Sequence, residues 1–195
     1  MEAFTTHTGT AVPLRQSNVD TDQIIPGEYL KRTSRDGFSD GLFATWREDP
    51  QFPLNLPQYR GASILVAGND FGTGSSREHA VWALWEGGFR VVISPRFGDI
   101  FRANSLKNGL LTVALDKDTT AHLQDRVEQT PHLQLEVDLS AREVRYDGSR
   151  ITFDISDFDQ MRLIRGQDDI DLTLSDASLI TSFETTRPSH LPRIT

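Results

Sequence analysis

Residues 68–82, GNDFGTGSSREHAVW, gather side chains that could do chemistry. Glycine-rich turns often bind phosphate, and a serine near a histidine can belong to a hydrolase. Neither motif is complete here, because the stretch lacks both G-x-x-x-x-G-K-[ST] and G-x-S-x-G. His79 follows Ser75 by only four residues on the same expected helix, whereas a catalytic base normally comes from elsewhere in the fold. We therefore expect His79 to be a helix residue that contacts a neighbouring loop.

The order of these residues favours an anion pocket instead. They follow an apolar run, residues 62–67, that is typical of a buried strand, and they lead into an expected helix at 75–86. A helix N-terminus offers free N–H groups and a positive partial charge. Gly72 and Gly74 would let the backbone turn sharply and approach a ligand. Arg77, a cation at the start of a helix, opposes the helix dipole and indicates a nearby anion.

Ser75 has two interpretations that the residues alone leave open. With Glu78 it has the S-x-x-E spacing of a capping box, and Ser75 or Ser76 would then stabilise the start of the helix. Alternatively, a serine alkoxide could act as a base if helix-terminal N–H groups stabilised its charge. Arg77 beside it is suited to hold a carboxylate with two hydrogen bonds.

Composition restricts what the 195-residue chain can supply by itself. It has no cysteine, so it offers no thiolate nucleophile, no disulfide and no sulfur ligand for an iron–sulfur cluster. Its histidines are scattered without zinc-motif spacing, and we expect no metal site. A net charge of −8 argues against nucleic acid or an anionic membrane as the main partner. With no apolar run near the roughly 20 residues of a span and no signal-peptide pattern, we expect a cytoplasmic protein.

Alternating elements are expected to position the glycine-rich loop. Apolar runs at 89–94 and 110–115 predict two further buried strands, and residues 98–108 predict a helix between them. This strand–helix alternation implies a parallel sheet with right-handed crossover helices. The segments before it look less regular. Residues 1–36 are expected to be irregular apart from an extended piece at 11–14, and residues 49–59, with three prolines, to form an extended loop.

The C-terminal part has a different pattern. Alternating apolar and polar residues predict antiparallel strands with one solvated face, at 133–139, 143–146 and 151–155. Asp147-Gly148 would form a hairpin turn between the last two. Helices are expected at 119–129 and 156–165, followed by a polar tail. We expect a single α/β domain over 1–195, with its core at about 1–120 and the C-terminal strands, helix and tail at about 120–195.

Two long motifs in this order, NVDTDQIIPGEYLK and FGTGSSREHAVWAL, resemble the small subunits of 3-isopropylmalate dehydratases. That family is similar to the swivelling domain of aconitase, and RFGDIFRANSLKNGLL fits it as well. The likeness is strong over residues 1–115 and looser to about 175. It implies an aconitase C-terminal-domain-like fold, a swivelling β/β/α domain with a parallel sheet, crossover helices and added antiparallel strands.

The resemblance also implies an activity and a partner. Family members interconvert 2-isopropylmalate and 3-isopropylmalate in leucine biosynthesis, as hydro-lyases that remove and restore water. Their [4Fe–4S] cluster is carried by a separate large subunit, over which the small subunit closes, and its open iron acts on the substrate hydroxyl as a Lewis acid. The expected partners are therefore that large subunit and a small hydroxy-dicarboxylate substrate.

By the same resemblance, Ser75 would be the base that removes a proton from the carbon next to a carboxylate. Ser76 and Arg77 would bind the substrate carboxylates. The loop that forms the anion pocket would comprise Gly72, Thr73 and Gly74.

A second segment is implied to contribute to the same site. Thr21 and Asp22 would lie at its mouth, and the loop at 30–35, with Arg32, would meet the variable part of the substrate. From the residues alone, Asp22 is more typical of a turn than of a site, and Arg32 is equally typical of a solvated basic loop. The loop at 27–37 carries charges and few anchors, and we expect it to be mobile in the free subunit.

Two positions depart from the family pattern, and two other functions stay open. The family often has cysteine where this chain has Thr73 and asparagine where it has Asp70. A carboxylate at position 70 would repel an anionic substrate unless it pointed away. The other functions are a related hydro-lyase subunit acting on homoaconitate, citraconate or a methylated malate, and a non-catalytic anion-binding module.

Overall fold

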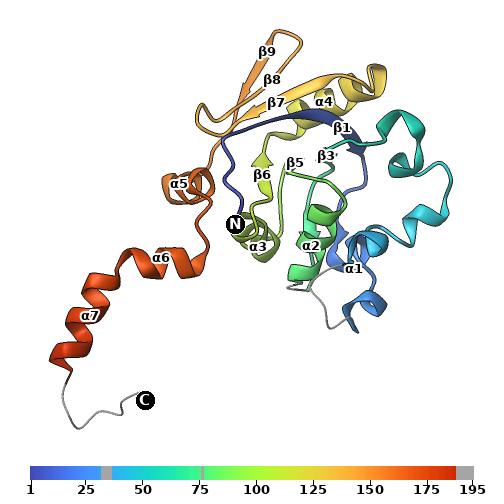
Figure 1. The fold of residues 1–195 in the computed structure, drawn as a ribbon. Helices are drawn as coiled ribbons and strands as arrows, with labels where there is room; N and C mark the ends of the chain where they lie inside the picture. The colour runs from blue at the N-terminus through green and yellow to red at the C-terminus, as the bar shows by residue number, and fades with distance from the viewer. Residues whose placement is uncertain (32–36, 76, 188–195) are drawn as a thin grey trace.

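A sheet with the strand order β6-β5-β3-β1-β7-β8-β9 organises the part of the chain that the structure describes (Figure 1). The structure is a computed structural model and describes residues 1–31, 37–75 and 77–187. The strands of this sheet are β1 (Thr6–Leu14), β3 (Ile64–Ala67), β5 (Val91–Ser94), β6 (Leu111–Ala114), β7 (Gln134–Asp138), β8 (Glu143–Tyr146) and β9 (Ser149–Thr152).

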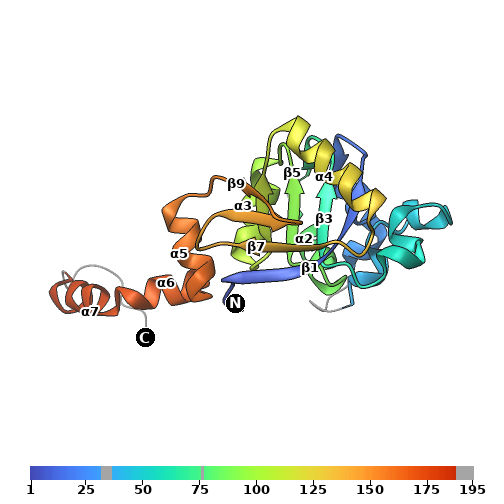
Figure 2. The ribbon, with the colours of Figure 1, turned by 90° about the horizontal axis from the view of Figure 1, so that it is seen from above.

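The parallel half of the sheet is buried on both faces. All residues of β3 and β5 are buried, as their continuous Val, Ile and Leu runs predict. Helices α2 (Glu78–Glu86) and α3 (Asp99–Lys107) pack together on one face, while α4 (Lys117–Gln129) covers the other (Figure 2). The predicted strand–helix alternation is therefore confirmed.

Strand β1 joins the two halves of the sheet. Its last residues, 11–14, pair in parallel with β3, whereas residues 6–10 pair antiparallel with β7. The expectation of irregular structure before residue 11 was wrong. Residues 6–10 are polar and mostly not buried, so they carry no apolar period, and their extended conformation comes from pairing with β7.

The antiparallel half confirms the predicted hairpin. Buried and partly exposed residues alternate along β7 and β8. Between β8 and β9, Asp147 (φ 47°) and Gly148 (φ 76°) both have left-handed backbone, as a two-residue hairpin loop of this kind requires. Most of β9 is exposed, as expected of an edge strand.

Shorter elements occupy the segments that the sequence analysis treated as irregular. Strands β2 (Val19–Asp20) and β4 (Phe71–Thr73) form a separate parallel pair, and β2 leads into the one-turn helix α1 (Thr21–Ile24). Residues 49–59 were expected to be extended, but prolines begin two 3-10 turns there, Pro53–Asn55 and Pro57–Tyr59, because proline's fixed φ suits a first helical position. Other 3-10 turns lie at Gly27–Lys31, Ser39–Gly41 and Trp46–Glu48.

The C-terminal segment is helical rather than an irregular polar tail. The predicted helix is α5 (Asp157–Arg165), capped by Ser156 and ended by Gly166 at φ 64°. Two further helices follow, α6 (Asp169–Ser175) and α7 (Ala177–Thr186), which project away from the sheet and have no buried residue (Figures 1 and 2). No helix within the described residues is long and apolar enough to cross a membrane.

Candidate functional site

The site is built from two loops that follow the paired strands β2 and β4. Val19 pairs with Phe71 and Asp20 with Thr73 in a parallel arrangement. The carboxyl ends of parallel strands lie at the same edge, so the segments after β2 and β4 must meet there. The glycine-rich loop was expected directly after the strand at 62–67. Instead, β4 intervenes, and it is β4 that brings this loop to residues 20–22.

Two glycines shape the second loop. Gly72 and Gly74 have φ of 73° and 84°, in the left-handed region that other residues seldom adopt. A side chain at residue 72 would also collide with Phe101, whose Cγ lies 2.2 Å from the position that a Cβ would occupy. At residue 74 the nearest atom is the Cβ of Asp20, at 3.2 Å. These glycines let the loop lie directly against α3 and against the β2–α1 segment.

The first loop is fixed by its own hydrogen bonds. Asp20 caps α1, since its carboxylate accepts from the backbone N–H of Gln23 at 2.8 Å, and the Gln23 side chain accepts from the Asp20 N–H at 2.9 Å. Thr21 is buried and its hydroxyl donates to the carbonyl of Ser75 at 3.0 Å. Sequence reasoning placed Thr21 at the mouth of the site. It missed the capping box D-x-x-Q, whose spacing could have revealed this helix.

Ser75 is exposed at the end of this loop and does not cap a helix. Helix α2 begins at Glu78, with Arg77 at its N-cap position and no side-chain capping bond. The capping-box interpretation of Ser75 was therefore wrong. The Glu78 carboxylate instead accepts a hydrogen bond from the side chain of Asn108, at 2.8 Å. Ser75 is held through its backbone, and its hydroxyl has no partner among the described residues.

Arg77 and Asp22 connect the two loops by charge. A guanidinium Nη1 of Arg77 donates to Oδ1 of Asp22 in an ion pair. The Arg77 side chain is 22% exposed and that of Asp22 is 55% exposed, so the pair lies at the surface of the site. Only Nη1 is engaged with Asp22, which leaves the other N–H groups of the guanidinium to bind a ligand.

Asp70 points away from this pocket. One of its carboxylate oxygens lies 3.0 Å from the guanidinium Nε of Arg96, and the other accepts from the Asn69 amide at 2.6 Å. The contact with Arg96 is electrostatic, because that oxygen has no hydrogen-bond donor in the described part of the chain. Asp70 also has φ of 60°, a conformation in which Asp and Asn are the favoured non-glycine residues.

Of the remaining predicted residues, the structure describes His79 and Thr73 but not Ser76 and Arg32. His79 packs its ring against Phe38 and Trp82, with centroids 5.3 and 4.8 Å apart, as expected of a structural helix residue. Thr73 ends β4, and its hydroxyl lies 3.5 Å from the Val19 carbonyl. Ser76 and Arg32 lie outside the described residues, and so do the other residues of 32–36 in the loop at 27–37.

Comparisons with known proteins identify the family of the chain. The chain is 64% identical over 192 residues to the 3-isopropylmalate dehydratase small subunit of Acidothermus cellulolyticus, covering 98% of each chain. It is 58% identical to the small subunit of Streptomyces coelicolor, over 99% of this chain and 98% of that one. The chain belongs to the 3-isopropylmalate dehydratase small-subunit family. The resemblance drawn from the two long motifs is thereby confirmed.

The fold of this small-subunit family member is confirmed in the same way. The family model for the aconitase C-terminal domain matches residues 1–118, and one described as LeuD_N matches residues 121–157. The crystal structure of 3-isopropylmalate dehydratase (leuD) from Methanocaldococcus jannaschii superimposes with a TM-score of 0.66 at 27% identity. That likeness covers 92% of this chain and 99% of the other.

The chain's own residues do not suit an iron–sulfur cluster. It contains no cysteine, and the described residues hold no group of three or more His, Asp and Glu side chains that could bind a metal ion.

Proposed function

We propose that this chain works as the small subunit of a 3-isopropylmalate dehydratase and contributes Ser75 as the group that moves the substrate proton. The reaction interconverts 2-isopropylmalate and 3-isopropylmalate in leucine biosynthesis. The observation that carries the proposal is the position of Ser75. It is exposed, does not cap a helix and is anchored through its carbonyl by the buried Thr21, two residues before Arg77 of the Arg77–Asp22 pair.

Dehydration requires a base beside a carbon acid. Ser75 Oγ, as the alkoxide, would take the proton from the carbon next to a carboxylate while the hydroxyl leaves the neighbouring carbon. This forms a carbon–carbon double bond, a neutral Ser75 hydroxyl and hydroxide, which one proton from solvent converts to water. In the reverse step, water adds its hydroxyl to the other carbon and releases one proton to solvent, while Ser75 returns the substrate proton to the first. The N-terminus of α2 and Arg77 supply positive potential that favours the alkoxide.

Arg77 would hold a substrate carboxylate. Its guanidinium is planar, and one edge stays available while Nη1 remains on Asp22. Asp22 thus orients the Arg77 guanidinium and leaves some of its N–H groups available to the substrate. Ser76, and Arg32 for the variable part of the substrate, are proposed as further binding residues on the strength of the family resemblance.

The iron–sulfur cluster of the assembled enzyme would belong to the large subunit, because this chain has no thiolate with which to hold one. The name shared by the relatives, small subunit, also implies such a partner. The proposed heteromer therefore divides its site between two chains, with proton transfer and carboxylate binding on this one.

Ser75→Ala tests this assignment, with Ser156→Ala as a matched control. Ser156 is a true helix cap, accepting from the Asp159 N–H at 3.1 Å. We expect Ser75→Ala to lower turnover by about 10²–10⁴ in the reconstituted complex with little change in melting temperature. Ser156→Ala should cost about 1 kcal/mol of stability and leave turnover intact.

Two further measurements sharpen the test. Cluster content is matched between the variant complexes, so that a difference in rate reports on this chain. Ser76→Ala should weaken substrate binding more than turnover, the opposite balance to Ser75→Ala. Near-parental turnover of Ser75→Ala would contradict the proposal.

A further inference from the structure

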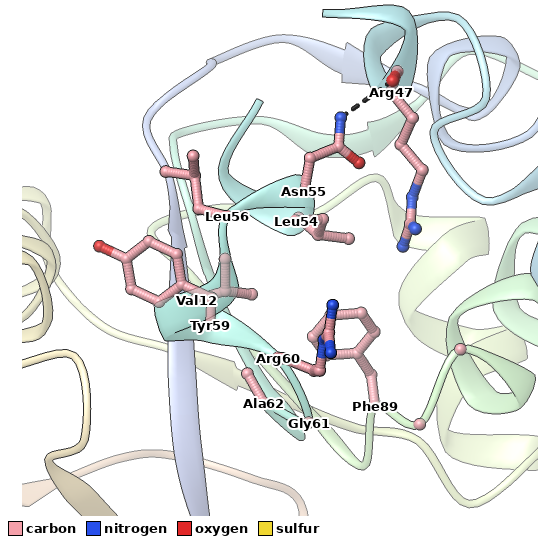
Figure 3. A pocket seen from close by; sticks show the side chains of 12 residues that line it. Val12, Arg47, Leu54, Asn55, Leu56, Tyr59, Arg60, Gly61, Ala62 and Phe89 are labelled. Carbon is pink, nitrogen blue, oxygen red and sulfur yellow. Dashed lines mark hydrogen bonds between the residues drawn. The ribbon is translucent and has the colours of Figure 1, made fainter. Parts of the chain in front are cut away.

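A cavity of about 450 Å³ lies at the opposite end of α2 from Ser75. It is enclosed by the 3-10 turns at 46–59, the Gly87-Gly88 segment that ends α2, and the start of the following strand segment (Figure 3). Its volume is within the range of small-molecule sites, about 300–1,000 Å³. The nine residues of α2 separate it from the serine loop by roughly 13 Å of helix, so it shares no residue with that site.

Two arginines project into this cavity. Arg47 and Arg60 come from different turns, and their guanidinium groups point toward the same open space (Figure 3). No carboxylate of the described residues pairs with either group. Elsewhere in the described chain arginines commonly hold acidic partners, as Arg15 does with Asp125 and Glu128. In a chain of net charge −8, two arginines that face one cavity without a counter-ion indicate a site for an anion.

The environment of Arg47 adds an energetic reason. Burial lowers the pKa of Arg47, since the charged guanidinium has lost part of its hydration without gaining a carboxylate. Its turn is also held in place, because the Asn55 amide donates to the backbone carbonyls of Arg47 and Asp49 at 2.9 and 2.8 Å. A bound anion would restore the lost interaction with little rearrangement.

The rest of the lining combines apolar side chains with polar groups, among them the Asn55 side chain. Leu54 and Phe89 lie beside the two guanidinium groups (Figure 3), and Val12, Leu56, Tyr59 and Ala62 also line the cavity. Gly61 and Gly88 leave free space at the edge, because no heavy atom lies within 4 Å of a Cβ built on either. Two cations beside the Leu54 and Phe89 side chains suit an organic anion, because its charged and hydrocarbon parts would each have a partner.

We propose that this cavity binds a small organic carboxylate, with the carboxylate between Arg47 and Arg60 and its apolar group on the leucine and phenylalanine side chains. None of the residues involved belongs to the Ser75 site, so the proposal does not depend on the proposed function. An aspartate or glutamate side chain of the large subunit has the same chemistry, and the experiment separates these two sources.

The test is a calorimetric titration of the full-length chain with acetate, butanoate and 3-methylbutanoate at constant ionic strength. Saturable binding is expected, with an affinity that rises about threefold for each added carbon as apolar area is buried. Arg47→Gln and Arg60→Gln should each raise Kd about tenfold or more, on the scale of a charge-assisted hydrogen bond. Arg150→Gln removes the same charge from the exposed β9 and should change nothing.

Leu54→Ala provides an independent test of the apolar wall. It should weaken 3-methylbutanoate and leave acetate unchanged. Melting curves without ligand establish whether each variant folds. If a glutamine variant does not fold, Arg60→Lys, which keeps the charge, is used in its place.

Several results would overturn the proposal. They are the absence of saturable binding, equal affinity for acetate and 3-methylbutanoate, or binding that survives the double substitution of both arginines. If no carboxylate binds while the arginine variants capture the large subunit less well, the two arginines serve a subunit contact instead.

Discussion

At the scale of single residues, the Arg77–Asp22 pair decides how the site presents its positive charge. Arg77 stands at the N-cap of α2, where a cation is disfavoured by the helix dipole. Asp22 compensates this charge from the other loop, yet it is more than half exposed, so the pair contributes little to stability. Its value lies in orientation, because it holds the guanidinium plane while leaving N–H groups for a ligand.

Arg77→Lys should keep the charge and lose that planar geometry. We expect the complex to lose about 2–3 kcal/mol of transition-state stabilisation, because one ammonium cannot bind Asp22 and a substrate carboxylate in the same way. The measurement is kcat/KM of the reconstituted complex. Arg165→Lys, the same change at an exposed position of α5, should stay near the parental value. Activity of the Arg77 variant within a factor of two of the parent would mean that Arg77 does not bind substrate.

At the scale of elements, β4 is the piece that assembles the site. It pairs with β2, and the backbone of Phe71 also bonds to the segment before α3, donating to the Arg96 carbonyl and accepting from the Gly98 N–H, both at 2.9 Å. Gly72 lies at the centre of this arrangement. Its position under Phe101 leaves no room for a side chain. The approach of α3 to the glycine-rich loop thus depends on Gly72 and also on Gly98, the N-cap of α3, where a Cβ would lie 2.3 Å from the Gly72 carbonyl oxygen.

Gly72→Ala should therefore be costly in two ways. The left-handed backbone strains any side chain by about 1–2 kcal/mol, and the collision with Phe101 adds about 1–3 kcal/mol of overpacking. Gly148→Ala is the matched control, since Gly148 has a similar φ of 76° with no atom within 4 Å of a built Cβ. Chemical denaturation should show a loss at residue 72 that clearly exceeds the loss at 148. Equal losses would show that the contact with Phe101 is easily relaxed.

At the scale of the whole molecule, β1 joins two halves of different character, and a histidine lies at this junction. His7 pairs with Val137 of β7, while its Nε2 lies 2.7 Å from the hydroxyl of Ser63, just before β3. Burial, and then the charge of Arg90, lower the pKa of His7 from 6.5. Protonation of His7 therefore changes its contact with Ser63, where the parallel and antiparallel halves of the sheet meet.

The sign of the resulting pH dependence follows from this lowered pKa. As pH falls below 6.5, His7 takes up a proton in the unfolded chain while the folded chain still resists it, so stability falls with falling pH. Once pH is below the folded pKa, the loss becomes constant. Melting temperatures between about pH 5 and pH 7.5 should show this decline, above the range where carboxylates titrate.

His7→Gln should flatten that decline, and His122→Gln, which removes an exposed histidine from α4, should not. A His7 variant with an unchanged pH profile would assign the decline to other groups.

The sequence by itself determined those features whose signal is local. Apolar runs identified β3, β5 and β6, and glycines marked the ends of α2 and α3. Alternation marked the antiparallel strands, and two long motifs identified the family. The missing cysteines restricted the chemistry without any structure. Each of these inferences depends on composition or on residues a few positions apart in the sequence. None of them requires knowledge of the tertiary contacts.

Only the tertiary structure decided which segments meet. The N-terminal half of β1 and the two residues of β2 have no apolar period, so their conformation comes from partners more than 50 residues away, which local pattern does not reveal. That pairing places Thr21 against Ser75 and Asp22 against Arg77. In the structure α2 begins at Glu78, so Ser75 does not cap the helix as its spacing to Glu78 suggested. The physical reason is that a backbone hydrogen bond to a distant strand stabilises a segment as well as a local one does, but leaves no periodic trace in the sequence.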